Sequence, residues 1–473
     1  MVKFEILTRD EIDLIHESTV NVLERVGVKV FEPGALKLLG EAGAEVNQKE
    51  MKAKIPEELL KECLKKAPRR FSLYSRKSGY KLDLEDGRTY FSTQGTAVFI
   101  IDAITGERRP STLKDVEKFY KLADALPNVH HATLVVHPTD IPEHVAHAYA
   151  LSIAFRNTTK TVDAYVSDKR TALDTVKIAS VVSGDKEKLS REPLLLMFYN
   201  PVSPLQHSKG LLEALQVFAQ YRQPVIIAPE CLSGATAPVT LAGLLVQQNA
   251  EVLSGIVIAE LYRPGAPVLY GTVSTVMDMR TGNIALGAIE GGLINTATAQ
   301  LARFYGIPCR GYGGTTEAKA ANIQAGFEKA FTLLMAAMSG VNFIYDAVGS
   351  LDSTLAASYE QAVIDDELCG IVSRALNGIS VDEETLAVEV IEKVGSEGNY
   401  LRELHTVQNL RKEHYIPALL FRQKWGAWAA SKDILNQARE KAERILREHQ
   451  PESLDRDVEA ELMSTVKEIV KTA

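Results

Sequence analysis

The chain has 473 residues, of which 46% are hydrophobic and 24% charged, and its formal net charge is -8. This length allows one large domain with additions, or two to three smaller domains. The acidic balance and the lack of a long basic run argue against a nucleic-acid partner, which would require clustered Lys and Arg. The N-terminus has no apolar signal core, and no run approaches ~18 uninterrupted apolar residues, so we expect a cytoplasmic protein without a membrane segment.

Residues 1–90 are predicted to form an N-terminal α+β cap. Thr8 and Glu11 have the spacing of a capping box and precede a helical pattern of apolar residues. Two more helices and a pair of small antiparallel strands are predicted over 33–42, 56–66 and 71–90.

Over residues 91–376, a short apolar strand is followed by a helix eight times. The strands are predicted over 90–101, 133–136, 161–166, 194–199, 225–228, 268–273, 307–312 and 342–348. The helices are predicted over 113–126, 143–155, 169–182, 209–221, 241–261, 289–305, 318–338 and 354–375. Short apolar strands that alternate with helices predict an α/β fold of the (β/α)8, or TIM barrel, type. A doubly wound open sheet is the alternative, but eight consecutive strand–helix units with the same pattern favour a closed barrel.

Residues 377–473 are predicted to form a C-terminal helical extension. Its helices are expected over 381–394, 418–428, 432–449 and 452–472, and their charged runs are interpreted as solvated faces. Trp425 and Trp428 add apolar surface beyond what capping a barrel requires. We therefore expect a symmetric homo-oligomer.

Aromatic residues are frequent where the predicted barrel strands end, which is where a barrel carries its site. They are Tyr165, Phe198, Tyr199, Tyr270, Tyr312 and Tyr345. Aromatic rings around a barrel mouth suit a cationic ligand. Packing at the barrel rim is the alternative for each ring, because strand alternation makes some of them face the helices.

Carboxylates also occur near these strand ends. They are Asp140, Asp168, Glu230, Glu317 and Asp346, and Asn200 follows the fourth strand. A mouth that combines carboxylates, tyrosines and an amide favours a small, positively charged ligand.

The seventh strand leads into a glycine-rich turn, Gly313-Gly314-Thr315-Thr316, and a helix is expected to begin near Glu317. Paired glycines allow positive φ or a close approach of the backbone to a ligand. An ordinary tight turn between strand and helix is the alternative.

The sequence contains no zinc, P-loop or dinucleotide signature. The four cysteines Cys63, Cys231, Cys309 and Cys369 are too scattered for a CxxC motif, and we expect buried, inert thiols. His144 and His147 have helical spacing but follow Pro142 at a predicted solvent-facing helix start. We therefore expect no bound metal.

Five segments resemble one known family. They are GTAVFIIDAITGERRPSTLKDV (95–116), NPVSPL (200–205), VMDMRTGNIALG (276–287), YGIPCRGYGGTTEAKAANIQAGFE (305–328) and HTVQNLRKEHYIPALLFRQKW (405–425). These blocks are similar to the trimethylamine:corrinoid methyltransferase family over nearly the whole chain. The resemblance implies a (β/α)8 barrel that transfers a methyl group from an amine to the Co(I) corrinoid (cobalamin) of a separate protein. It implies a corrinoid-protein partner and no cofactor bound by this chain itself.

Founding members of that family carry pyrrolysine, in or close to the glycine-rich loop after the seventh strand. This chain has the standard residues Gly313-Gly314-Thr315-Thr316 there. The resemblance therefore points to the branch without pyrrolysine, which includes glycine betaine methyltransferases. It implies a quaternary amine as the methyl donor, with a betaine as the leading candidate.

The strand ends and the resemblance together give a set of expected substrate-binding residues. They are Phe198, Tyr199, Asn200, Tyr270, Arg310, Tyr312, Gly313, Gly314, Glu317, Tyr345 and Asp346. Asn200, Arg310 or His137 is expected to hold the carboxylate of a betaine. A quaternary ammonium leaves as a neutral tertiary amine and needs no general acid, so no catalytic residue is assigned. The alternatives are a methylamine donor, methyl transfer between a pterin and a corrinoid, and non-catalytic binding of quaternary amines.

Overall fold

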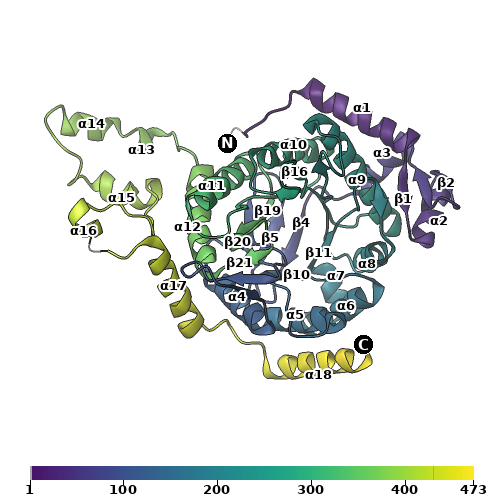
Figure 1. Ribbon diagram of the computed structural model, residues 1–473. Helices are drawn as coiled ribbons and strands as arrows, with labels where there is room; N and C mark the ends of the chain where they lie inside the picture. The colour runs from purple at the N-terminus through teal and green to yellow at the C-terminus, as the bar shows by residue number, and fades with distance from the viewer. Residues whose placement is uncertain (1–2, 430) are drawn as a thin grey trace.

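The computed structural model describes residues 3–429 and 431–473. Eight parallel strands close into a barrel, which confirms the predicted fold (Figure 1). In chain order they are β6 (Tyr90–Thr93), β9 (His131–Ala132), β10 (Thr161–Ala164), β11 (Leu195–Tyr199), β13 (Val225–Ile227), β15 (Val268–Gly271), β18 (Cys309–Tyr312) and β19 (Phe343–Val348). The last strand, β19, pairs with β6, so the barrel has no open edge.

A helix follows each barrel strand and forms part of an outer ring (Figure 1). These helices are α4 (Leu113–Ala125), α5 (Glu143–Asn157), α6 (Lys169–Ser183), α8 (Lys209–Gln220), α9 (Leu241–Tyr262), α10 (Ile289–Tyr305), α11 (Ile323–Met338) and α12 (Tyr359–Leu376). A short helix, α7 (Lys186–Arg191), lies between α6 and β11.

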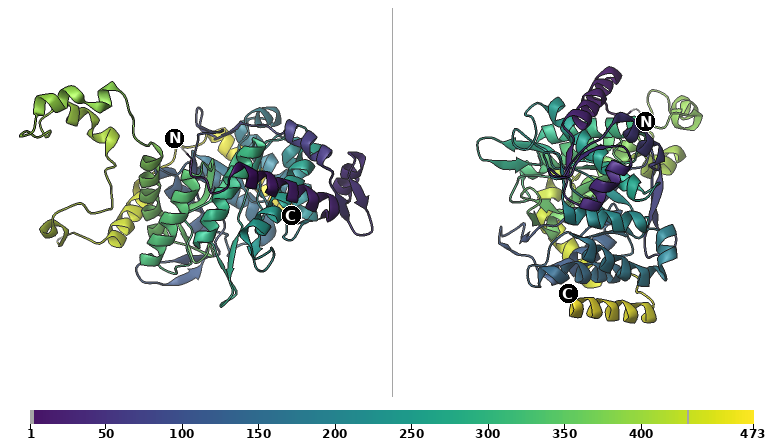
Figure 2. Two further views of the ribbon diagram at one scale, coloured as in Figure 1. Left: turned by 90° about the horizontal axis from the view of Figure 1, so that it is seen from above. Right: turned by 90° about the vertical axis from the view of Figure 1, so that its right-hand side faces the viewer.

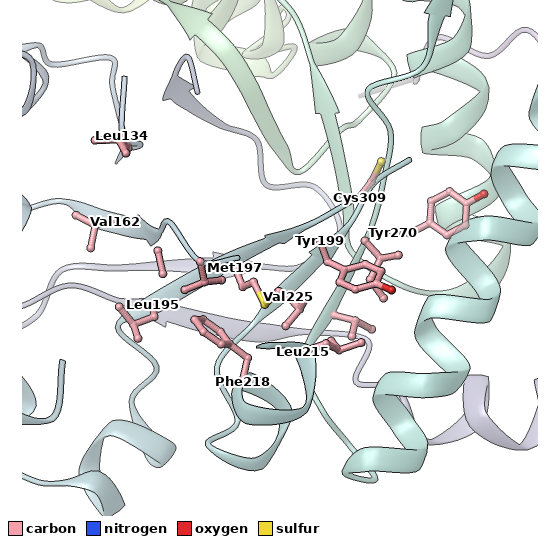
Figure 3. Close-up of a cluster of buried hydrophobic side chains, with 14 of the residues drawn as sticks. Leu134, Val162, Leu195, Met197, Tyr199, Leu215, Phe218, Val225, Tyr270 and Cys309 are labelled. Carbon is pink, nitrogen blue, oxygen red and sulfur yellow. The ribbon is translucent and has the colours of Figure 1, made fainter. Parts of the chain in front are cut away.

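Side-chain alternation along the strands separates the barrel interior from the layer between strands and helices. On β11, Leu195, Met197 and Tyr199 belong to the large core under the helices, while Leu196 and Phe198 belong to a second, interior cluster. Figure 3 shows the first group beside side chains of α8. The strand is thus buried on both faces, as the parallel strands of a barrel require.

A hairpin of β4 (Phe71–Tyr74) and β5 (Lys81–Leu84) packs against the barrel interior. Its residues Leu73, Leu82 and Leu84 share the interior cluster with Leu196 of β11. The Tyr74 N–H also donates to the carbonyl of Pro193, just before the start of β11, at 2.7 Å. The hairpin therefore plugs the amino end of the barrel and leaves the carboxyl ends of the strands for the site.

The remaining N-terminal elements pack beside α9. Helix α1 (Arg9–Arg25) begins at the predicted capping box, in which the Thr8 N–H donates to the Glu11 carboxylate at 2.7 Å. With α3 (Glu57–Lys66), α1 covers α9 (Figure 1). The other elements of this segment are β1 (Val28–Val30), α2 (Pro33–Glu41), β2 (Glu45–Asn47) and β3 (Lys52–Lys54), and β1 also pairs with β12 (Gln206–His207).

Within the described part of the chain, one helix, α9, is long and apolar enough to cross a membrane by length and composition. Its apolar window is 72% buried. Burial under α1 and α3 and against the barrel strands accounts for its apolar character.

Two small sheets rise from the carboxyl ends of the strands beside the barrel mouth. One contains β7 (Phe99–Ile101), β8 (Arg108–Pro110), β20 (Ser350–Leu351) and β21 (Ala356–Ala357), and the other contains β14 (Leu232–Ser233), β16 (Thr275–Asp278) and β17 (Asn283–Ala285). The prediction of one strand over 90–101 is therefore wrong, because its first part joins the barrel and its last part pairs with β21 and β8.

Two other predicted boundaries differ from the structure. The second barrel strand ends at Ala132, whereas the sequence pattern predicts it over 133–136. Helix α11 begins at Ile323 rather than near Glu317. The reason is local, because the Asn322 side chain accepts from the Ala325 N–H at 3.1 Å and caps the helix there.

The C-terminal extension has two parts. Helices α17 (Ile434–Glu448) and α18 (Arg456–Thr472) pack on the barrel, α17 against α12 and α4, and α18 against α5 and α6. Between α12 and α17, most of the chain projects away from the barrel (Figures 1 and 2), but Tyr415 and Ala418 return to bond with Glu367 of α12. This projecting part contains α13 (Glu383–Leu386), α14 (Val388–Val394), α15 (Leu404–Glu413) and α16 (Trp425–Ala429).

Two predicted helices of this projecting part are wrong in detail. The helix expected over 381–394 is broken at Ala387, whose φ of 51° is left-handed. The helix expected over 418–428 is limited to α16, and the sequence pattern does not predict α15. Weak apolar periodicity in exposed, charged segments explains both errors.

A buried ion pair fixes the loops at the mouth to the outer ring. Lys329 of α11 and Asp365 of α12 lie 3.0 Å apart, and both side chains are almost fully buried. Lys329 also donates to the carbonyl of Gly314 at 2.6 Å, after β18, and Asp365 accepts from the Gly349 N–H at 2.8 Å, after β19. The pair therefore connects two helices with the two loops that leave the neighbouring barrel strands.

We expect Asp365→Ala to destabilise the protein by about 3–5 kcal/mol, because it leaves the Lys329 ammonium buried without its partner. Chemical denaturation followed by circular dichroism measures this loss. Glu468→Ala is the matched control, since Glu468 pairs with Lys177 on the surface at 2.8 Å and should change stability little. Equal effects of the two substitutions would contradict a structural role for the buried pair.

Candidate active site

A cavity of about 330 Å³ opens at the carboxyl ends of the barrel strands. Its lining consists of Gly95, Thr96, Leu134, Asp163, Ala164, Tyr165, Val166, Phe198, Asn200, Leu211, Glu230, Val273, Leu286, Arg310, Tyr345, Asp346 and Thr354. This volume lies at the lower end of the range for small-molecule sites, roughly 300 to 1,000 Å³. The position is the one at which barrel enzymes carry their active sites.

The Arg310 side chain, only 2% exposed, is fixed between two aromatic rings. Its guanidinium carbon lies 4.8 Å from the ring centre of Phe198 and 4.6 Å from that of Tyr345. One guanidinium nitrogen donates to the carbonyl of Thr272, and another lies 3.6 Å from the Asp346 carboxylate. Cation–π contacts and one carboxylate thus compensate the buried positive charge.

Asp346 is the partner of this guanidinium and has unusual backbone geometry. Its φ is 63°, a left-handed value that costs energy in a residue with a side chain. This conformation brings its carboxylate within 3.1 Å of the Gly95 N–H, which donates to it. Burial raises the pKa of Asp346, and the charge of Arg310 opposes this rise. Backbone strain at a buried carboxylate in a cavity supports a functional role.

Asp163 is a cavity residue that the sequence analysis missed. It lies on β10 between Val162 and Ala164, and its carboxylate accepts from the Leu134 N–H at 3.0 Å. Burial raises the pKa of Asp163 to about 7. A search limited to residues at strand ends misses Asp163, although a carboxylate between the buried apolar residues Val162 and Ala164 is itself a signal.

The cavity has an excess of acidic groups. Burial, and next the charge of Asp346, raise the pKa of Glu230. The lining therefore holds three carboxyl groups, those of Asp163, Glu230 and Asp346, and one guanidinium. A cation that entered would stabilise the ionised carboxylates, which are otherwise disfavoured by burial. The electrostatics of the cavity favour a positively charged ligand.

The structure brings five of the expected site residues together in the cavity lining: Phe198, Asn200, Arg310, Tyr345 and Asp346. All are contributed by β11, β18 and β19 or by the residues that directly follow these strands. Tyr165 and Glu230, noted at other strand ends, line the same cavity.

Three expected tyrosines lie outside this lining. Tyr199 bonds through its hydroxyl to His207 at 2.7 Å, and Tyr270 donates to Asn249 of α9 at 2.8 Å. Both rings pack in the core between strands and helices, as Figure 3 shows, because they stand at outward positions of their strands. Tyr312 is buried and donates to the carbonyl of Ser274 at 3.0 Å.

The glycine-rich turn after β18 packs against α11 rather than the cavity. A side chain at Gly313 would approach the Leu333 backbone to 2.9 Å, and Gly314 has a φ of 77°. Glu317 accepts from the Gly287 N–H at 2.8 Å and so holds the segment after β17. The paired glycines are thus required by close packing and a left-handed turn.

Other polar candidates have structural partners. Asp140 accepts from the Leu113 N–H at 2.8 Å at the start of α4, and Asp168 accepts from the Thr171 N–H at 2.8 Å and caps α6. His137 lies 2.6 Å from Glu143. None of the three contributes to the cavity lining described above.

In residues 3–429 and 431–473, no group of three or more His, Cys, Asp or Glu side chains is arranged to hold a metal ion. His147 lies 3.2 Å from Asp174 on the neighbouring helix. The cysteines are free thiols and buried, as predicted.

A closed barrel of eight parallel strands with helices between them defines the TIM-barrel class of proteins. Within that class, a family model described as trimethylamine methyltransferase (MTTB) matches residues 1–470. The chain belongs to this family and is a methyltransferase.

Two similar curated proteins have different names. The glycine betaine methyltransferase of Desulfitobacterium hafniense (strain Y51) is 36% identical over 98% of this chain and 97% of its own length. The trimethylamine methyltransferase MttB of Methanosarcina barkeri is 37% identical over 98% of this chain and 95% of its own length. Sequence identity alone therefore does not distinguish between the two names.

A solved structure supports the fold independently. The monomethylamine methyltransferase MtmB of Methanosarcina barkeri superimposes with a TM-score of 0.56 over 94% of this chain and 89% of that chain. The sequence identity is 12%, so this likeness concerns the fold alone.

The raised pKa of Asp163 predicts a pH dependence of stability. The folded-state pKa of about 7 exceeds the usual value near 3.9. The stability that the protonated Asp163 contributes is therefore fully present below about pH 3.9 and is lost as the pH rises to about 7. We expect Asp163→Asn, which keeps an acceptor for the Leu134 N–H, to gain stability relative to wild type between about pH 5 and about pH 8. Urea denaturation at both pH values measures the difference, and a constant difference would contradict the raised pKa.

Proposed function

We propose that this methyltransferase transfers a methyl group from a quaternary amine, with glycine betaine as the leading candidate, to the Co(I) corrinoid of a partner protein. The observation that carries the proposal is the charge arrangement of the cavity, in which acidic groups and a fixed guanidinium lie around one small space. A betaine has the complementary charges, a permanent cation and a carboxylate. The cytoplasmic location predicted from the sequence is part of the same proposal.

The cationic end of the donor would be held by Asp163 and Glu230, with the ring of Tyr165 beside them in the lining. The Phe198 ring is partly exposed to the cavity while Arg310 lies over it. Carboxylates and aromatic rings both attract a trimethylammonium group, which has no N–H to donate. Such a group is bound by charge and shape rather than by hydrogen bonds.

The carboxylate end of a betaine would be held by Arg310 and Asn200. The rings of Phe198 and Tyr345 fix the guanidinium plane, and the Asn200 amide donates to the carbonyl of Ala228 at 3.0 Å, which fixes its orientation. A guanidinium and an amide in fixed positions are suited to a carboxylate, since little rotamer freedom is lost on binding. Trimethylamine has no carboxylate that could bind to Arg310 and Asn200.

The reaction requires orientation more than proton transfer. When the partner protein is docked, its Co(I) corrinoid supplies the nucleophile. The C–N bond to one methyl group breaks, and the neutral tertiary amine retains the electron pair of that bond. The residues of this chain would hold the donor with one methyl group directed to the mouth, and would exclude water from it.

The rim of the barrel mouth is suited to a protein that brings the acceptor. Val202, Val239, Met279 and Leu355 are exposed apolar residues on four different loops at the carboxyl end of the barrel. A corrinoid protein docked over the open mouth would contact these side chains.

A trimethylamine or other methylamine donor is the second candidate, because relatives of the two names are 36% and 37% identical to this chain. Purified protein mixed with a Co(I) corrinoid protein distinguishes the donors. We expect the absorbance change of corrinoid methylation with glycine betaine and little change with trimethylamine. Activity with trimethylamine and none with any quaternary amine would overturn the substrate assignment.

Binding measurements separate the two ends of the cavity. We expect Asn200→Ala to weaken glycine betaine binding more than tetramethylammonium binding, since only the betaine has a carboxylate. Phe198→Ala should weaken tetramethylammonium binding by about five- to thirtyfold, which corresponds to about 1–2 kcal/mol of cation–π attraction. It should weaken glycine betaine binding at least as much, because the Phe198 ring also fixes Arg310 at the carboxylate end. Isothermal titration calorimetry with each ligand measures these changes.

Tyr199→Phe is the matched control for Phe198→Ala. It removes the hydroxyl bond to His207 on the helix side of the same strand, so both affinities should stay at the wild-type values. Equal losses of both ligands in Asn200→Ala would remove Asn200 from the carboxylate end.

A further inference from the structure

Three consecutive residues at the cavity have left-handed backbone conformations although each has a side chain. Asp352, Ser353 and Thr354 have φ values of 53°, 51° and 66°. Residues other than glycine adopt this region mostly as single residues, because the Cβ atom comes too close to the following carbonyl oxygen. The three residues belong to the turn of the hairpin β20–β21, and Thr354 lines the cavity. An unfavourable backbone conformation is therefore present directly at the site.

A second threonine of the cavity lining has the same unusual geometry. Thr96, which follows β6, has a φ of 58°. A left-handed conformation is a clear outlier for threonine, because its side chain is β-branched. The two threonines lie on neighbouring loops, since the Val98 N–H donates to the carbonyl of Leu355 at 3.2 Å. With Asp346, they are the cavity residues in which a side chain is combined with a positive φ.

Bonds from two other segments hold the strained turn in place. The Ser353 N–H donates to the carbonyl of Thr316 at 2.8 Å, and the Asp352 carboxylate lies 2.7 Å from the Lys319 ammonium. The Ser353 hydroxyl also donates to the carbonyl of Ile284 in β17 at 3.3 Å. Such surrounding bonds keep a strained conformation populated. None of the three strained positions is a glycine, although glycine would relieve the strain.

The hydroxyl groups of both threonines are available to a ligand. Both side chains are half-buried and line the cavity. Deeper in the barrel, the hydroxyls of Thr93 and Thr133 bond to each other at 2.8 Å. By contrast, the hydroxyls of Thr96 and Thr354 have no hydrogen-bond partner in the part of the chain that the structure describes. Two strained residues thus direct unpartnered hydroxyls at the same cavity.

We propose that Thr96 and Thr354 form a collar that orients the reacting N-methyl group of the donor. This role rests on the proposed function, in which the donor lies in the cavity with one methyl group directed to the mouth. Arg310 and Asp346 lie on barrel strands, whereas both threonines lie on loops beyond the carboxyl ends of β6 and β19. The threonines are therefore on the mouth side of the donor, beside the methyl group that is transferred.

The chemistry of the threonine side chain suits this position. The methyl groups of a quaternary ammonium carry part of its positive charge, so their C–H groups are attracted to a hydroxyl oxygen. The threonine methyl group beside that oxygen excludes water from the same space. A β-branched side chain has few χ1 rotamers, so the strained backbone holds both groups in a fixed direction. A fixed collar restricts the direction of the C–N bond, and in-line attack requires one direction.

Thr354→Gly tests the collar, because it relieves the backbone strain and removes the side chain. We expect a stability in urea at least equal to that of wild type, because glycine has no penalty at positive φ. Methyl transfer should be about ten- to a hundredfold slower, while glycine betaine affinity stays within about threefold, since a misplaced reacting atom costs rate more than binding. The absorbance of Co(I) cobalamin, added free in solution as the acceptor, gives the rate, and calorimetry gives the affinity. The same change at Thr96 should repeat this result.

Two further variants separate the hydroxyl from the backbone. Thr354→Val keeps the β-branched shape and the strain but has no hydroxyl, so it should lose rate without exceeding the stability of wild type. Thr354→Ser keeps the hydroxyl and should keep the rate within about threefold of wild type. Thr281→Gly is the matched control, since Thr281 is exposed in the turn between β16 and β17 and has no left-handed φ. Glycine there should lower the stability and leave the rate unchanged.

Three results would overturn the collar. They are wild-type rates in both Thr354→Gly and Thr354→Val, a loss of affinity in Thr354→Gly as large as its loss of rate, and a loss of stability as large as that of Thr281→Gly. Failure of the proposed function has a different signature, because wild type would then transfer a methyl group from trimethylamine and not from glycine betaine. In that case, the same measurements with trimethylamine as the donor test the collar.

Discussion

The buried guanidinium of Arg310 is the constraint on which the organisation of the site depends. An almost fully buried positive charge requires compensation, and the structure provides it through two aromatic faces, one backbone carbonyl and Asp346. These contacts hold β11, β18 and β19 in fixed positions relative to one another at the mouth. The buried charge of Arg310 also explains the strained backbone of Asp346. In its left-handed conformation, the Asp346 carboxylate lies near both the Arg310 guanidinium and the Gly95 N–H.

Closure of the barrel determines which side chains reach this site. Each strand sends alternate residues into the interior and into the layer under the helices, so neighbouring residues such as Phe198 and Tyr199 have unrelated roles. The hairpin β4–β5 fills the amino end, and the cavity that remains is small and acidic. A small, cation-attracting cavity is consistent with the methyltransferase family to which the chain belongs, and it supports a donor with a permanent positive charge.

Helix α11 connects the site with the surface of the protein. Its inner face carries Glu328 and Lys329, which hold the loop after β18, and its outer face carries an exposed aromatic pair, Phe327 and Phe331. The buried pair of Lys329 and Asp365 extends this connection to α12 and to the loop after β19. Through Lys329 and its partner Asp365, helix α11 therefore holds both loops that follow β18 and β19.

The sequence by itself determined the barrel, because eight repeats of a short apolar strand and a helix can bury their faces in few other ways. It also identified Phe198, Asn200, Arg310, Tyr345 and Asp346, since their places at strand ends put them at the mouth. Only the tertiary structure decided which tyrosines face inward, because the direction of a side chain depends on strand register and a shift by one residue reverses it. The same holds for Asp163, whose burial and pKa of about 7 arise from neighbours on other strands. The helices α13 to α16 are poorly predicted from the sequence because they have no buried residues, so that no buried face imposes a clear apolar period on them.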